Sequence, residues 1–190
     1  MFLLVGLGNP GREYENNHHN VGFMAVDEIC HRYLFSDFKK KNNALICEGN
    51  ISGQKVIAIK PQTYMNLSGE AVQSVMAFYK ITPENIIVIH DDMDLKMGQV
   101  KSKIGGSAGG HNGLKNIDLH IGQHYGRIRI GIGRPKEKQE VVNFVLSDFT
   151  KQDKMILDDV IKTVSDLMEV YVEKGQTAFS SIVGEKLNGI

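Results

Sequence analysis

The stretch IIVIHDD at residues 86–92 joins four consecutive β-branched residues to three polar ones, and it decides the fold class. An unbroken apolar run of this kind is typical of a strand that is buried on both faces of a parallel sheet. The run FLLVG at residues 2–6 has the same character. Because ligands of open α/β sheets bind outside the carboxyl ends of the strands, we expect a site where these two strands end.

Strand and helix patterns alternate along the rest of the chain. Further strands are expected over residues 44–51, 56–60, 99–104 and 127–133, the first two forming a hairpin. Helices are expected over residues 21–33, 68–80 and 151–174, and a short one from Leu114. Ser68 is available as the N-cap of its helix, and Lys39–Asn43 has the composition of a surface turn. The interleaving predicts an α/β fold, and the hairpin makes its sheet mixed.

Length and composition indicate one globular domain. The 190 residues fall in the usual range of about 100–200 for a domain, so we expect a single domain over residues 1–190. Cys30 and Cys47 are too few for a disulfide framework, and no apolar run approaches the ~18 residues of a membrane span. The N-terminus lacks the basic segment of a signal peptide, so we predict a cytoplasmic protein without a membrane partner.

The formal net charge of zero hides an uneven distribution of charged side chains. Residues 96–138 hold nine Lys or Arg and two Asp or Glu, a net charge of +7, whereas residues 1–95 carry −3 and residues 139–190 carry −4. Ten of the 20 glycines lie in the same basic third. Glycine loops and positive charge together suit a polyanionic ligand, although a basic face that binds nothing fits the charge equally well.

The loop GLGNPG at residues 6–11 has the glycine spacing of a dinucleotide-binding fingerprint. That motif runs directly into a helix whose N-terminus holds the pyrophosphate, whereas residues 12–17 show no apolar periodicity. The acidic residues about 20 positions on, Asp27 and Glu28, fall within a predicted helix and not at a strand end. We therefore expect a rigid turn that presents Asn9.

His18 and His19 stand in a polar loop just before a helix, where buried core residues are not expected. Exposed spacers would explain them, but histidine is also the commonest general base near neutral pH. Asp91, at the end of a buried strand, is suited to fix the tautomer of a histidine and to stabilise its imidazolium. A metal cluster of these residues with His90 and His111 is a weaker alternative, because the spacings match no standard site.

The glycine-rich loop at residues 105–113 contains a G-x-S-x-G pattern that would make Ser107 a nucleophile. Such an elbow needs a helix immediately after the serine, and the glycines that follow are poor helix formers. A flexible loop that carries His111 and Asn112 beside Lys103 fits the sequence better.

The segment TYMNLS at residues 63–68 leads into a predicted helix. A structural role as a loop and helix cap would account for it. Asn66 has a second use to consider, because an amide both donates and accepts hydrogen bonds and so matches a peptide bond.

Six motifs occur in the order found in bacterial peptidyl-tRNA hydrolases, from Met1 to about Leu146. They are GLGNPG at 6–11, HNVG at 19–22, TYMNLSG at 63–69, HDDMDL at 90–95, GGHNGLK at 109–115 and RIRIGIGRP at 127–135. The sequence therefore resembles this family, which implies one compact α/β domain with a twisted mixed sheet surrounded by helices, usually monomeric. The resemblance also implies hydrolysis, with no metal and no cofactor, of the ester between a peptide and the tRNA ribose.

The same resemblance assigns roles to residues of this chain. His19 matches the catalytic histidine, a general base that activates water, and Asp91 matches the acid that orients it. The residues expected to contact the substrate or the attacking water are Asn9, Tyr14, Tyr64, Met65, Asn66, His111 and Asn112. Lys103 and Arg129 match the basic residues that hold the tRNA phosphates, so the expected partner is peptidyl-tRNA.

Three departures from the family pattern leave points open. The residue before the catalytic histidine is often Arg in the family and is His18 here, so a shared role for His18 stays open. The family often has Pro after residues 94–95, which this chain lacks, and the stretch at 122–126 is short. A non-catalytic RNA-binding relative is a rival, but it would be indicated by loss of the catalytic His or Asp, and both are present.

Overall fold

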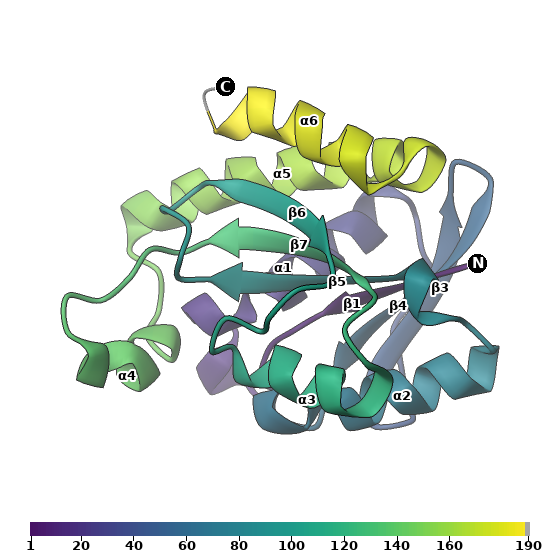
Figure 1. The fold of residues 1–190 in the computed structure, drawn as a ribbon, viewed down its shortest axis with the longest axis horizontal. Coiled ribbons are helices and arrows are strands. Elements are labelled where there is room, and N and C mark those ends of the chain that lie inside the picture. Colours follow the sequence, from purple (N-terminus) through teal and green to yellow (C-terminus); the bar gives the residue numbers. More distant parts are fainter. Residues whose placement is uncertain (189–190) are drawn as a thin grey trace.

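The computed structural model describes residues 1–188 and shows a seven-stranded sheet between two layers of helices (Figure 1). The strands are β1 (Phe2–Gly6), β2 (Lys39–Lys41), β3 (Ala44–Ile51), β4 (Gln54–Pro61), β5 (Ile86–Asp92), β6 (Val100–Ile104) and β7 (Gly126–Gly131). Their order is β2-β3-β4-β1-β5-β7-β6, with β4, β1, β5 and β7 parallel and the rest antiparallel. The predicted mixed α/β sheet is confirmed; the last two residues of the expected domain lie outside the described part.

The helices cover both faces of the sheet. They are α1 (Val21–Arg32), α2 (Ser68–Tyr79), α3 (Asn112–Ile121), α4 (Val141–Val145), α5 (Lys151–Lys174) and α6 (Gln176–Leu187). Leu4 of β1 packs in the core under α1, α5 and α6, whereas its neighbours Leu3 and Val5 pack in the core under α2 and α3. Burial of successive side chains on opposite faces explains the unbroken apolar run. Within residues 1–188, no helix has the length and apolar character needed to cross a membrane.

Several boundaries differ from the sequence expectations. Lys39–Lys41 is an edge strand paired with β3 and not a turn, and its exposed lysines are typical of strand edges. Ser68 is the first residue of α2 and not its cap, because its hydroxyl donates to the Met65 carbonyl. The third helix begins at Asn112, two residues before the expected start, because His111 caps it. Helices α4 and α6 were not anticipated.

The N-terminus of α1 lies hard against the ends of β1 and β5. Gly22 makes this possible, since a Cβ there would run into the Ile89 carbonyl and the backbone of Leu7. The 3-10 turn His18–Asn20 leads directly into α1. The close approach therefore holds the two adjacent histidines beside the end of β5.

Candidate active site

A cavity of about 530 Å³ lies at the carboxyl ends of β1 and β5, as expected for an open α/β sheet. Most of the site residues expected from the sequence line it: Asn9, His19, Tyr64, Met65, Asn66, Asp91, Lys103, His111, Asn112 and Arg129. Tyr14 is not in the lining. The fold thus brings together side chains that are up to 120 positions apart in the chain.

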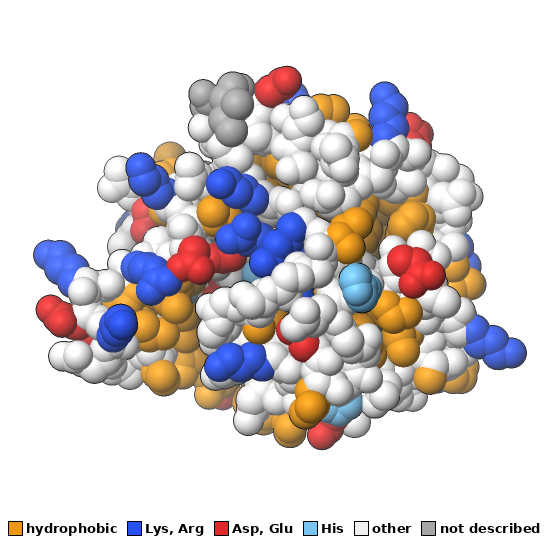
Figure 2. Space-filling model, in the orientation of Figure 1, with side chains coloured by type: hydrophobic (Ala, Val, Ile, Leu, Met, Phe, Trp, Pro, Cys, Tyr) orange, Lys and Arg blue, Asp and Glu red, His pale blue; other side chains and the backbone are white. Residues whose placement is uncertain are grey.

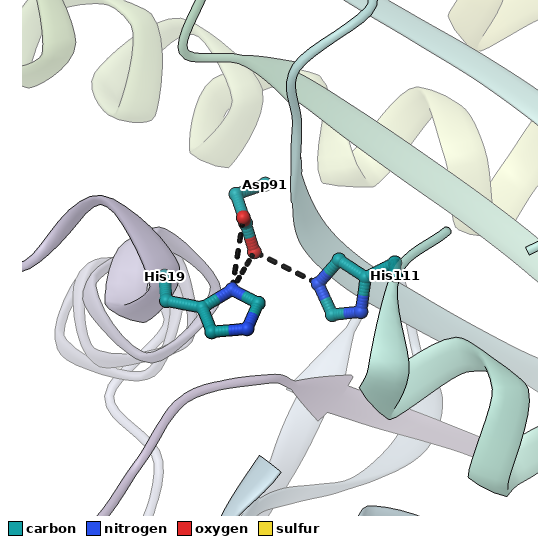
Figure 3. Close-up of side chains that lie close together, drawn as sticks. All are labelled: His19, Asp91 and His111. Carbon is teal, nitrogen blue, oxygen red and sulfur yellow. Dashed lines mark hydrogen bonds and ion pairs between the residues drawn. The ribbon is translucent and has the colours of Figure 1, made fainter. Parts of the chain in front are cut away.

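Asp91 is the centre of the site (Figure 3). Its side chain is 3% exposed, and both carboxylate oxygens lie 2.9 Å from His19 Nδ1, while one lies 2.8 Å from His111 Nε2. Burial opposes ionisation of Asp91, but the two histidines more than offset it and hold the pKa of the carboxyl well below its usual value. Asp91 is therefore a carboxylate at neutral pH.

His19 is oriented by this carboxylate. Because Nδ1–H donates to Asp91, the other ring nitrogen, Nε2, keeps its lone pair, and within residues 1–188 it has no hydrogen-bond partner. Burial lowers the pKa of His19, whereas the charge and hydrogen bonds of Asp91 raise it, and the net shift is upward from 6.5. The expectation from the sequence that these two histidines are not buried is wrong: His18 and His19 are both buried. The arrangement leaves one free basic nitrogen at the cavity wall.

His111 is held in the opposite tautomer by the helix that it caps. Its Nδ1 accepts from the backbone N–H groups of Gly113 at 3.1 Å and Leu114 at 3.3 Å, the first donors of α3. Nε2 must therefore carry the hydrogen that is donated to Asp91. The helix cap and the contact with Asp91 together fix this tautomer, so Nε2–H is a donor held toward Asp91.

His90 completes a ring of three histidines around Asp91. Its Nδ1 donates to the Asp91 carbonyl at 2.7 Å. Complete burial and the proximity of His111 lower the pKa of His90 to about 3. His90 is therefore neutral at physiological pH, and of the three only His19 combines a raised pKa with an unpartnered ring nitrogen.

Asn9 is fixed by a network that the sequence did not reveal. Its backbone N–H donates to Asn20 Oδ1 at 2.8 Å, and Asn20 Nδ2 donates back to the Asn9 carbonyl at 2.9 Å. The Asn9 Oδ1 accepts from the Met65 N–H at 2.7 Å. Since Oδ1 is occupied, Asn9 presents Nδ2 as its free donor. Asn20 lies within the HNVG motif, but only the structure shows that it positions Asn9.

Comparison with known proteins identifies the family. The family model for peptidyl-tRNA hydrolase matches residues 3–188. The chain belongs to the peptidyl-tRNA hydrolase family. Peptidyl-tRNA hydrolase from Rhizobium etli is 46% identical over 189 residues, covering 100% of this chain and 79% of the relative. That from Chelativorans sp. is 48% identical over 179 residues, covering 94% and 75%.

A solved structure supports the same assignment. The crystal structure of peptidyl-tRNA hydrolase from Acinetobacter baumannii superposes with a TM-score of 0.87 at 36% identity, covering 95% of this chain and 94% of that one. Family membership makes this protein a hydrolase that acts on ester bonds, and it confirms the family resemblance of the six motifs.

Two tyrosines lie beside each other near the cavity: Tyr64 belongs to its lining, and Tyr14 contacts Tyr64. Tyr64 is 54% exposed and has a φ of +61°, a strained value for a residue with a side chain. Tyr14 reaches the site only through Tyr64, with ring centroids 6.5 Å apart in an edge-to-face arrangement. Asn66 and Asn112 are exposed residues of the lining. Contact of these four residues with substrate stays a prediction.

Lys and Arg side chains gather over β6 and β7 on the face shown in Figure 2. Lys103 and Arg129 line the cavity; Arg129 Nε donates to Asp92 at 2.8 Å, and Lys103 Nζ lies 3.4 Å from the Ser107 carbonyl. Partial burial and the nearby Arg129 and Arg127 guanidinium groups lower the pKa of Lys103. Arg127 also belongs to the cavity lining, but it is fully buried and lies under the glycine loop.

The alternative chemistries find little support in the geometry. The GLGNPG loop runs into a 3-10 turn at Arg12–Tyr14 and not into an α-helix. Ser107 is followed by glycine loop, and α3 begins only at Asn112. For a metal, the donor atoms of His19, Asp91 and His111 do lie within 4.8 Å of one another. Two of those nitrogens already donate hydrogen bonds to Asp91, so a metal would have to displace both protons.

Proposed function

We propose that the protein hydrolyses the ester between the peptide and the tRNA ribose in peptidyl-tRNA, with His19 as the general base. The observation that carries this proposal is the pairing of His19 Nδ1 with the buried Asp91 carboxylate at 2.9 Å, which leaves Nε2 free. A neutral imidazole held in this tautomer can take a proton from water, and such catalysis contributes roughly 10²–10⁴-fold. Asp91 stabilises the imidazolium that forms.

Stabilisation of the oxyanion is assigned to a neutral hydrogen-bond donor. The free Nδ2 of Asn9 lies on the cavity wall and is suited to donate to the oxyanion that develops on the ester carbonyl. Loss of one such donor costs about 2.7–4 kcal/mol in other hydrolases. An ester has a good leaving group, so direct attack by water suffices and Ser107 is not needed.

Two groups of lining residues are assigned to the two parts of the substrate. We assign Lys103 and Arg129 to the phosphates of the tRNA, and Met65, Asn66 and Asn112 to the peptide; all five line the cavity. The exposed asparagines suit a peptide bond, which both donates and accepts. We further propose a monomeric enzyme that acts in the cytoplasm; light scattering on the purified protein at micromolar concentration tests the monomer.

The deciding experiment is hydrolysis of N-acetyl-aminoacyl-tRNA by the wild type and by His19→Ala, each with and without a chelator. We expect His19→Ala to lose at least about 100-fold in kcat while binding tRNA normally. His31→Ala, at an exposed position of α1, is the matched control and keeps full activity.

Three results would each contradict a part of the proposal. Near-wild-type activity of His19→Ala would remove the general base. Loss of wild-type activity in the chelator, restored by a divalent cation, would instead indicate a metal held by His19, Asp91 and His111. A comparable rate on aminoacyl-tRNA with a free α-ammonium group would argue against peptide recognition by the asparagines.

A further inference from the structure

His18, the neighbour of the proposed base, faces away from the cavity. Its side chain is buried between two aromatic rings: Phe144, stacked at a centroid distance of 4.4 Å, and Phe149, tilted at 4.2 Å. Its Nδ1 donates to the Ser147 carbonyl at 2.7 Å. His18 is absent from the cavity lining, so this geometry does not support a share in the role of His19.

The contacts of His18 belong to a larger attachment between two segments. The backbone N–H of His18 donates to the Ser147 carbonyl at 3.0 Å, and that of Phe149 donates to the Asn16 carbonyl at 3.2 Å. Asn17 Nδ2 donates to Asp148 Oδ1 at 2.7 Å. Residues 147–149, which directly follow α4, are thereby bound to the turn that carries His19.

Helix α4 depends on this attachment. None of its residues is buried, and outside its own segment it packs chiefly on the His18–Asn20 turn; Figure 1 shows it set apart from the other helices. Yet four apolar residues of this region line the cavity: Val141, Val142, Val145 and Leu146. We call these four residues the apolar wall. Within residues 1–188, none of the four belongs to either hydrophobic core cluster, so we attribute their position to the attachment.

We propose that His18 is a positioning residue that holds the apolar wall over the cavity, and that the wall contacts the side chain of the amino acid esterified to the tRNA. This inference rests on the proposed function, which places the ester at His19. The amino acid that carries the ester carbonyl must then lie within the same cavity. The asparagines provide polar contacts for its peptide bond. The wall supplies four of the apolar side chains of the lining, in addition to Met65, Met93, Ala108 and Leu114, and it is the apolar surface that we assign to the amino acid side chain.

Four variants separate the two contacts that His18 makes. His18→Ala removes both the stacking and the hydrogen bond, His18→Phe keeps the stacking, His18→Gln keeps a donor, and His18→Arg supplies a planar group that can do both. With N-acetyl-phenylalanyl-tRNA we expect His18→Ala to raise KM about tenfold, the size expected for partial loss of one apolar contact surface. The kcat value should change less than about threefold, and His18→Arg should restore KM.

Substrate choice tests the role of the wall. N-acetyl-glycyl-tRNA has no side chain to contact it, so its KM should stay nearly unchanged in His18→Ala. A fall in kcat with both substrates, with KM unchanged, would instead show that His18 acts on His19 and would overturn the inference.

A double-mutant cycle with Val142→Ser completes the experiment. Val142 is 67% exposed, so this substitution should leave folding intact. If His18 acts through the wall, Val142→Ser raises KM in the wild type and adds little in His18→Ala, whereas additive effects would contradict the proposal. Leu119→Ser, at an 81% exposed position of α3 outside the cavity lining, is the matched control. If His19→Ala is fully active, the proposed function is wrong. If His19→Ala is inactive but His18→Ala has an unchanged KM, only the inference about His18 is wrong.

Discussion

Asp91 and Arg127 are both charged side chains removed from water on neighbouring strands, yet their partners differ in kind. Asp91 is paired with the rings of His19 and His111, and His19 keeps a ring nitrogen, Nε2, that can take up a proton. Arg127 donates to the Gly106 and Ser107 carbonyls and to the Asp118 carboxylate, and none of these partners is an imidazole. The difference teaches that a buried charge serves catalysis where its partner has a nitrogen free to take up a proton, and serves structure where its partners only accept hydrogen bonds.

Replacing Asp91 by Asn is the strongest test of the first half of this comparison. The amide keeps the size of the carboxylate but removes the charge that stabilises the His19 imidazolium and lets the imidazole adopt the wrong tautomer. We expect kcat to fall by roughly 10²–10⁴-fold, the range of general base catalysis. Single-turnover hydrolysis of N-acetyl-aminoacyl-tRNA measures it. A loss below about fivefold would show that the buried pair is structural after all.

Replacing Arg127 by Met tests the second half. The variant leaves two loop carbonyls without their donor and leaves Asp118 Oδ1 with the Tyr125 hydroxyl but without its cationic partner, and breaking a buried pair in this way costs about 3–5 kcal/mol in other proteins. Urea denaturation should show a loss of about 3 kcal/mol in the free energy of unfolding. Arg134→Met, at an exposed ion pair with Asp94, is the control and should change stability by less than about 1 kcal/mol. If both variants lose equally little, Arg127 is not a structural charge.

The strands could be predicted from the sequence, whereas the burial of His18 and Arg127 could not. We could predict β1, β5 and the loops that follow them, because a buried strand is recognised from a run of consecutive apolar residues. The burial of His18 could not be predicted, because it depends on rings 126 and 131 positions away in the chain. Arg127 counted toward the basic third, although the structure buries it under the glycine loop. The spacing of apolar residues predicts the local helix or strand. Packing between segments that are distant in the sequence determines which charged side chains are exposed to solvent.

The pH dependence of activity should follow His19 and not Arg127. Only neutral His19 can accept a proton, and its pKa is raised above 6.5, mainly because the effects of Asp91 exceed that of burial. We therefore expect kcat/KM to fall about tenfold per pH unit below the pKa of His19 and to level off above it. In Arg127→Met the midpoint should be unchanged. In Asp91→Asn it should drop, because burial alone lowers the pKa of a histidine.

The contribution of His19 to the free energy of unfolding should fall as pH rises through its folded pKa, where kcat/KM rises. The folded pKa of His19 is raised, so its contribution to stability is fully present below the unfolded value of 6.5 and is lost as pH rises through the folded value. Asp91, with a depressed pKa, contributes above 3.8 and loses this contribution only as pH falls through its folded value. Urea midpoints from pH 6.5 to 9 measure the effect of His19, because below 6.5 the unfolded state also protonates His90, whose folded pKa is about 3, and stability there rises with pH. Activity and stability that rise together with pH would contradict the assignment to His19.

The smallest effects are expected at Lys103 and Arg129, the half-buried basic residues of the cavity lining. Lys103→Ala and Arg129→Ala should each raise KM a few-fold, leave kcat nearly unchanged and reduce the salt slope of tRNA binding by about one. Arg129 should have the larger effect, because Asp92 already fixes its guanidinium, whereas the Lys103 ammonium is held only by a long contact to Ser107. Lys55→Ala, at an exposed lysine of β4 outside the cavity lining, is the control. If tRNA binding has the same salt slope in all three variants, the tRNA responds to the overall charge of the surface. Lys103 and Arg129 would then have no specific role in positioning it.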